Sequence, residues 1–410
     1  MNIASFIAGR IVFQKSHSFS RFIIRLSAAA TAISVAIMII ALAFVAGFQE
    51  AVANKVFSFW GHIRVQQQEP SVSGLAEELP SYKNDSIEKT LQHIPSGKWV
   101  DVYATKSAML KTTESIEGIL LKGVDASFHK ERIVPYLVEG SWLSFDTSSS
   151  QYPVLISAYT AKQLQLKTGD KAFLYFIENE ESLPRVRPVT VCGIYKTSIE
   201  EYDKTFVLVN LQLIQKINGW SAQQIAGYEL TLKDYQKDIS TSNQLLDSIP
   251  TSWYASPVRN IYPNIFDWLK LQNTNRQIII AVMCAVAIMN LITCLLILVL
   301  ERSRMIGLLK ATGATDTQVQ SIFWQQGIIV AVAGIIIGNL LGLGICWLQQ
   351  STGFIRLDET AYYVAQAPVK IIWWQVVLVS LFTFLVSLLV LLIPSLLVRR
   401  IRPVTALRFE

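Results

Sequence analysis

Four long segments without a charged side chain constrain the fold of this chain more than any other feature. They cover residues 26–48, 277–300, about 321–349 and 371–398. A helix needs about 20 residues to cross the roughly 30 Å hydrocarbon core of a bilayer, and each segment is long enough. Because 51% of the residues are hydrophobic and 16% are charged, the composition is also that of a membrane protein. The sequence therefore predicts four transmembrane helices.

Basic residues at the ends of these segments indicate their orientation, because Lys and Arg are retained on the cytoplasmic side. Residues 1–25, 301–320 and 399–410 together carry eleven Lys or Arg and three acidic residues, a net charge of +8. The whole chain carries +6. Both termini and the 301–320 loop are therefore expected in the cytoplasm, with residues 49–276 and the short loop 350–370 outside. The basic charge is a topology signal, and no nucleic-acid partner is expected.

Residues 49–276 change from apolar blocks to alternating strand patterns and short helices, which predicts a large α+β domain between the first and second membrane helices. Pieces at about 61–105 and 225–260 are expected to form one subdomain, with a β-rich second subdomain inserted. Residues 49–60 and 262–276 have helical patterns continuous with the adjacent spans, which predicts two helical stalks. Strands are expected at 99–105, 116–124, 153–157, 171–177, 188–194, 205–209, 228–233 and 253–259, and helices at 86–94, 158–166, 211–217 and 235–249.

No catalytic, cofactor or metal site is expected on this chain. It lacks the GxxxxGK[ST] phosphate-binding loop, HExxH and CxxC spacings, and a nucleophile elbow. The four histidines are scattered and are interpreted as surface or strand-edge residues: His17, His62, His93 and His129. Ionisable residues are absent from the four spans, which argues against an ion pathway. The protein is predicted to be a non-catalytic subunit that takes its energy from a partner.

The segment LERSRMIGLLKATGA, residues 300–314, resembles the signature that follows the second transmembrane helix of the FtsX-like permeases. This family includes MacB exporters and the lipoprotein-releasing LolC and LolE subunits, and the resemblance to LolC and LolE is the strongest. It extends through residues 7–10, 47–48, Gly327 and 394–410, and through 184–195 with 201–203. One departure is Met305, where the family usually has an acidic residue.

The resemblance implies a subunit of a type VII ABC transporter in the bacterial inner membrane. Two such permease subunits, identical or different, would pair, and a separate ATPase dimer would bind ATP and Mg. The ATPase is expected to dock on a coupling helix at 301–320. Its candidate contact residues are Glu301, Arg302, Arg304, Ile306, Gly307, Leu309, Lys310 and Gly313.

The spacing within this segment supports such a role. Ile306, Leu309 and Gly313 can share one helical face and offer an apolar ridge, which Arg302 and Lys310 would flank. The alternative is a juxtamembrane helix that lies on anionic lipid.

Three further sets of residues are candidate sites. Six apolar residues of the first two spans and their stalks are predicted to face lipid, where an acyl chain could enter between subunits: Val45, Phe48, Val52, Phe57, Ile265 and Leu269. A polar hairpin tip is either solvated or, by resemblance, a hook for a periplasmic lipoprotein carrier, with candidates Leu183, Pro184, Arg185 and Arg187. Gly334, Gly338 and Gly342 form a small-residue stripe for close helix packing, within one subunit, across a dimer, or as a sliding surface.

The favoured function is the release of lipoproteins from the inner membrane, driven by cytoplasmic ATP hydrolysis. The large outside domain and the resemblance around residues 185–203 favour it. One alternative is a MacB-like exporter of peptides or drugs. The other is an FtsX-like signalling scaffold that activates a cell-wall hydrolase, although such scaffolds usually have a smaller outside domain.

Overall fold

The computed structural model of the chain describes residues 19–67, 80–145, 152–176 and 185–391. These residues divide into two compact units. A β-rich unit joins Ala51–Trp268 to Leu357–Ala365, and a helical unit contains the other described residues.

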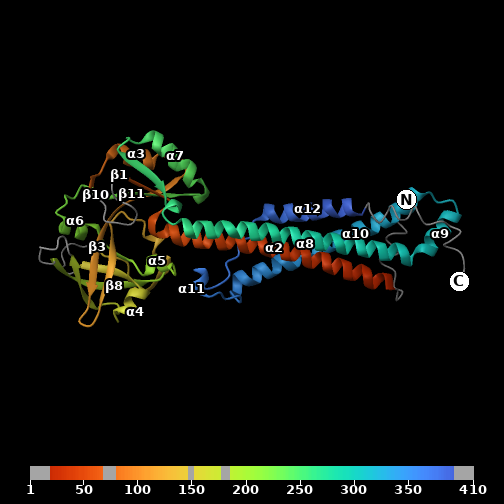
Figure 1. The fold of residues 1–410 in the computed structure, drawn as a ribbon, viewed down its shortest axis with the longest axis horizontal. Helices are drawn as coiled ribbons and strands as arrows, with labels where there is room; N and C mark the ends of the chain where they lie inside the picture. The colour runs from red at the N-terminus through yellow and green to blue at the C-terminus, as the bar shows by residue number, and fades with distance from the viewer. Residues whose placement is uncertain (1–18, 68–79, 146–151, 177–184, 392–410) are drawn as a thin grey trace. The chain divides into compact units, whose positions relative to one another are not determined.

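Four helices within the described residues are long and apolar enough to cross a membrane. They are α2 (Phe19–Trp60), α8 (Pro263–Glu301), α10 (Asp316–Thr352) and α12 (Trp373–Val390) (Figure 1). The first three predicted spans lie within α2, α8 and α10. The last, 371–398, contains α12 and extends beyond it at both ends, and its residues 392–398 lie outside the described residues. All the named strands lie between α2 and α8 in the sequence. The predicted fold class, four membrane helices with an α+β domain inserted between the first and second, is therefore confirmed.

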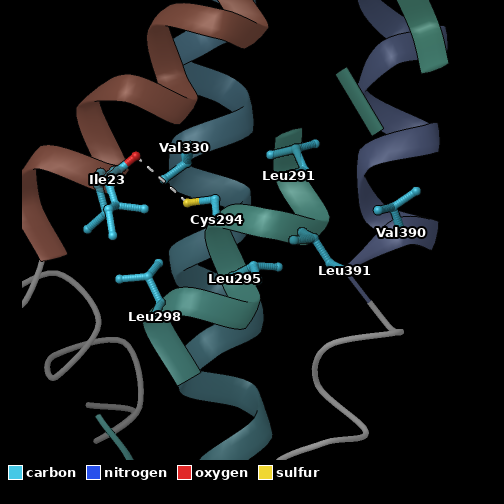
Figure 2. Packing of buried hydrophobic residues seen from close by; sticks show 9 residues of the cluster. Ile23, Leu291, Cys294, Leu295, Leu298, Val330, Val390 and Leu391 are labelled. Carbon is cyan, nitrogen blue, oxygen red and sulfur yellow. Dashed lines mark hydrogen bonds between the residues drawn. The ribbon is translucent and has the colours of Figure 1, made fainter. Parts of the chain in front are cut away.

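The helical unit packs through apolar side chains that come from all four long helices. Figure 2 shows Ile23 of α2 beside Cys294 and Leu298 of α8, with Val330 of α10 and Val390 of α12 in the same cluster. Two polar side chains inside this unit hydrogen-bond to neighbouring helices, which offsets the cost of placing them in an apolar environment. Asn290 donates to the carbonyl oxygen of Ser27 at 2.9 Å, and Asn339 donates to the Ser380 hydroxyl at 2.9 Å.

In the β-rich unit, ten of the described strands form one sheet, and two short strands pair separately. The order along the sheet is β12-β1-β11-β3-β4-β9-β6-β8-β5, and β7 pairs with β3 and β8. The strands are β1 (Ile63–Gln67), β3 (Gly97–Lys111), β4 (Ile116–Val124), β5 (Leu137–Gly140), β6 (Tyr152–Ser157), β7 (Lys171–Phe176), β8 (Arg185–Tyr195), β9 (Phe206–Asn210), β11 (Gly227–Leu232) and β12 (Trp253–Pro257), with β2 (Ser81–Tyr82) on β10 (Gln224–Ile225).

The long strand β3 joins the two parts of this sheet (Figure 1). Its first half, from Gly97 to Tyr103, pairs with β11, and its second half, from Tyr103 to Lys111, pairs with β4. Early and late segments of the domain therefore meet at one end of the sheet, where β1 lies between β11 and β12. Strands from the middle of the domain form the other end, so one continuous sheet contains both predicted subdomains.

Short helices complete the unit: α3 (Asp85–Gln92), α4 (Ala158–Gln163), α5 (Glu200–Asp203), α6 (Leu211–Asn218) and α7 (Asp238–Ser248). The predicted helix at 235–249 is divided into a 3-10 turn, Tyr235–Lys237, and α7. The predicted elements have no counterpart for strands β1, β2, β5 and β10 or for helix α5. The stretches 49–60 and 263–276 are helical, as parts of α2 and α8.

Candidate functional site

The basic segment after the second membrane helix forms a separate short helix, α9 (Ser303–Ala311), between α8 and α10. Ile306 is fully buried in a cluster with Val299 of α8 and with Val319 and Phe323 of α10, and Leu309 packs against this cluster. The prediction that Ile306 presents an apolar ridge to a partner is therefore wrong. The shared helical face exists, but it packs against α8 and α10 of the same chain.

The opposite face of α9 is exposed. Arg304 and Leu308 lie one helical turn apart on it, and 58% of Leu308 is exposed. Glu301 and Gly313 are exposed at the two ends, Arg302 is half-buried as the residue before α9, and Gly307 is buried. Leu308 was absent from the predicted contacts, because helical spacing groups residues on a face without telling which face points outward.

Lys310 and Gly313 shape the turn from α9 into α10. The Lys310 ammonium lies 2.8 Å from Asp316 at the start of α10, so Lys310 holds this turn and does not flank an exposed apolar ridge. Gly313 has a φ of +98°, which L side chains rarely adopt. Helix α10 then begins with a reciprocal cap between Thr315 and Gln318. These features fix the turn between α9 and α10.

The glycine stripe of α10 packs against α2 of the same chain. A Cβ added at Gly338 would lie 2.7 Å from the carbonyl oxygen of Ala32 and from the Val35 Cβ. At Gly334 it would meet the Thr31 side chain at 2.8 Å, and at Gly342 the Ala36 backbone at 3.1 Å. The three glycines therefore let the two backbones approach closely, as small-residue stripes do in membranes.

The six residues predicted to face lipid are instead buried, with at most 6% of any of them exposed. The Phe57 ring lies 4.3 Å from that of His62 and 5.3 Å from that of Phe266. The Gln49 side chain donates to the carbonyl oxygen of Leu269 at 2.8 Å. The expectation of lipid exposure is wrong because α2 and α8 turn these apolar positions toward the chain's own core. The six residues predicted to face lipid and found buried are Val45, Phe48, Val52, Phe57, Ile265 and Leu269.

Of the hook candidates, Leu183 and Pro184 lie outside the described residues. Arg185 begins β8 opposite Phe176 of β7, and its guanidinium donates to the carbonyl oxygen of Ile217 at 2.6 Å. Arg187 is half-buried, and its guanidinium donates to the backbone carbonyl of Val186 at 3.0 Å. Both arginines therefore have contacts within the domain.

A buried network of charges at the end of α2 escaped the sequence analysis. Asp101 of β3 and Glu229 of β11 lie directly opposite each other and are fully buried. Two like charges in this position would repel. Arg132 bridges them, with one nitrogen 2.7 Å from Asp101 and another 2.8 Å from Glu229. Lys122 of β4 lies 2.5 Å from the other oxygen of Glu229.

The two cations of this network also bind the last carbonyl groups of α2. Arg132 donates to the carbonyl oxygen of Ser58 at 3.1 Å, and the Lys122 ammonium donates to that of Phe59. Carbonyls at a helix C-terminus lack intrahelical partners and carry partial negative charge, so buried cations stabilise them. Burial lowers the pKa of Lys122 to about 8, against the opposing attraction of Glu229. The network fixes the end of α2 to three strands of the sheet.

His62, predicted at the surface or at a strand edge, directly precedes β1 and is buried next to this network, so it is not a surface residue. Its Nδ1 accepts a hydrogen bond of 2.9 Å from the backbone N–H of Leu232, which requires an unprotonated nitrogen. Burial, together with nearby Arg132, lowers the pKa of His62 to about 3.

A pH dependence of stability follows from His62. Its pKa is lower in the folded protein than in the unfolded chain, so the contribution is complete above pH 6.5 and is lost as the pH falls toward 3. Acidification to about pH 5 should cost roughly 2 kcal/mol through this residue. Melting temperatures of the protein in detergent at neutral and acidic pH measure the loss. His62→Asn keeps an acceptor without a titrating group, and an equally steep dependence in that variant would contradict the assignment.

Two family models match this chain. Residues 277–403 match the FtsX-like permease C-terminal model, and residues 26–243, more than half of the chain, match the MacB-like periplasmic core domain model. The first region contains α9 and the glycine stripe. The second contains the buried charge network and every strand of the sheet except β12.

Curated relatives extend over nearly the whole chain. The lipoprotein-releasing system transmembrane protein LolC of Xylella fastidiosa is 22% identical, with 97% of this chain and 96% of the relative covered. LolC of Haemophilus influenzae is 25% identical with 100% and 99% covered, and LolE of the same organism is 23% identical with 99% of each covered.

Among solved structures, the periplasmic region of MacB from Actinobacillus actinomycetemcomitans aligns with a TM-score of 0.34 and 12% identity, covering 50% of this chain and 92% of that one. The extracellular domain of the transporter YknZ from Gram-positive bacteria aligns with a TM-score of 0.32 and 17% identity, covering 48% and 100%.

Proposed function

The chain belongs to the family of permeases with a MacB-like periplasmic core domain and an FtsX-like C-terminal domain, and on this premise we propose that it releases lipoproteins from the inner membrane as a subunit of an ABC transporter. The observation that carries the proposal is the similarity to LolC and LolE over nearly the full chain. The chain pairs with a second permease subunit, and a separate ATPase dimer binds ATP and Mg²⁺. Both termini and α9 lie on the cytoplasmic side, in agreement with the basic flanks.

We place the ATPase contact on the exposed face of α9. Leu308 supplies an apolar anchor and Arg304 a flanking charge, while the buried Ile306 fixes α9 to α8 and α10. Because the Lys310–Asp316 ion pair holds the turn after α9, a displacement of α9 is transmitted to α10.

Leu308→Asp tests this contact. A charge introduced into an apolar interface loses its hydration without gaining a partner, so we expect ATPase binding to weaken by at least about tenfold, or about 1.4 kcal/mol. Co-purification of the tagged permease with its ATPase in mild detergent gives the measurement. Ile116→Asp is the matched control, because Ile116 is similarly exposed but lies at the start of β4. Wild-type binding by Leu308→Asp would remove this face from the contact.

Lipoprotein release is tested by reconstitution of the complete complex in vesicles that carry a lipidated lipoprotein. We expect ATP-dependent transfer of the lipoprotein to a soluble periplasmic carrier, whose contact we place on the segment that links β7 to β8. ATP-dependent transport of a soluble peptide without lipoprotein release would favour the exporter function instead.

A further inference from the structure

The short segment between α10 and α12 is built into the β-rich unit. Leu357–Ala365 belongs to that unit, although the residues on either side of it belong to the helical unit. The backbone N–H of Leu357 donates to the carbonyl oxygen of Ala365 at 3.0 Å and closes the segment at its base. A single turn of helix, α11 (Glu359–Tyr362), lies inside it.

Glu359 connects this segment to the loop that follows β8. Its carboxylate forms an ion pair with Lys196 and accepts a hydrogen bond from the Ser198 hydroxyl. The position of Ser198 is fixed in turn, because its backbone N–H donates to the buried Asp203 at 2.9 Å. The partners of Glu359 therefore lie on a well-anchored part of the domain.

The same segment also contacts the ends of α2 and α8 that lie in the β-rich unit. The Lys55 ammonium of α2 donates to the carbonyl oxygen of Tyr363 at 2.6 Å. The Trp268 ring of α8 stands at 81° to the Tyr363 ring, with 5.9 Å between their centroids. One short segment is thus held by both stalk helices and by the sheet.

Backbone strain is concentrated at this junction. Among the described residues, three residues other than glycine have a positive φ, and two of them are Ser198 at +64° and Tyr363 at +60°. Such a conformation persists only where surrounding contacts enforce it, and it occurs often at switch and clamp regions. The hydrogen bonds to Ser198 and Tyr363 are contacts of that kind.

We propose that Glu359 and Lys196 are positioning residues that form a latch between the α10–α12 loop and the periplasmic domain. Through the latch, a movement of α10 and α12 is transmitted to the β-rich unit, which also contains the ends of α2 and α8. The inference rests on the proposed function, since it assigns a path for the ATP-driven movement. Glu359 and Lys196 lie outside α9, so changes to them leave the proposed ATPase contact intact.

Charge reversal tests the latch. Glu359→Lys or Lys196→Glu places like charges together, and we expect each to lower the lipoprotein released per ATP hydrolysed by about threefold, the scale of an exposed ion pair. The double reversal should restore the ratio, because it brings opposite charges together again. ATPase binding and basal hydrolysis should stay at wild-type levels throughout. Lys204→Glu is the matched control, because Lys204 forms its ion pair with Glu200 on α5.

A second readout needs no lipoprotein. In the wild-type complex, trapping of the ATP-bound state should change amide hydrogen exchange in both α11 and β8, whereas each single reversal should change it in α11 alone. Single reversals with wild-type release ratio and exchange, or a double reversal as impaired as the singles, would overturn the latch. A wild-type complex that shows the linked exchange without releasing lipoprotein would instead count against the proposed function.

Discussion

Arg132→Met is expected to destabilise the protein by about 3–5 kcal/mol, because it leaves two buried carboxylates without their shared cation. Asp101 and Glu229 are fully buried and directly opposite each other, and Arg132 lies within 2.8 Å of both. The variant also removes the hydrogen bond to the carbonyl oxygen of Ser58 at the end of α2. In a domain of this size the loss corresponds to a fall in melting temperature of roughly 10 °C.

Thermal unfolding of the full chain in mild detergent measures this effect. Lys204→Met is the control, because it removes an exposed ion pair of the same domain and should leave the melting temperature unchanged. Arg132→Lys keeps the charge but cannot bridge two carboxylates with a planar fork, so we expect an intermediate value. If Arg132→Met and Lys204→Met had the same melting temperature, the network would contribute nothing to stability.

This network shows where sequence reasoning fails. Lys122 follows Leu120 and Leu121 in β4, and Arg132 lies in a charged surface-like stretch, so neither position suggests burial. Charged residues are rarely fully buried unless paired. The pairing here joins β3, β4, β11 and the 3-10 turn Lys130–Arg132, which come from different parts of the sequence. Only the strand register brings Asp101 opposite Glu229.

Local patterns, by contrast, were sufficient for most elements. Alternation located β4 at its observed bounds, and the charge-free segments located the long helices. Strand β5 was missed because it has four mostly exposed residues, which produce no alternating pattern. The spacing of Ile306 and Leu309 identified a real apolar face. This face is covered by α8 and α10, the helices that precede and follow α9 in the sequence. A pattern therefore identifies a face, while tertiary contacts decide what that face touches.

The glycine stripe leads to the second large effect. Gly338→Leu should prevent α2 and α10 from packing, because even its Cβ would lie 2.7 Å from the Ala32 carbonyl oxygen, a backbone atom that cannot rotate away. We expect little folded protein to be recovered in mild detergent. Gly338→Ala adds only that Cβ and should destabilise the fold by about 1–3 kcal/mol, the usual cost of overpacking.

Gly344→Leu is the matched control, because Gly344 lies on the same helix and a Cβ added there would meet no atom of another part of the described chain within 4 Å. Gel filtration and thermal unfolding compare the three variants with the wild type. Equal loss from Gly338→Leu and Gly344→Leu would show that leucine harms α10 wherever it is placed, and that the close approach to α2 is not the cause. If Gly338→Ala folds and binds its ATPase but loses coupled release, the α2–α10 contact also moves during the cycle, since static packing alone would be satisfied by a stable fold.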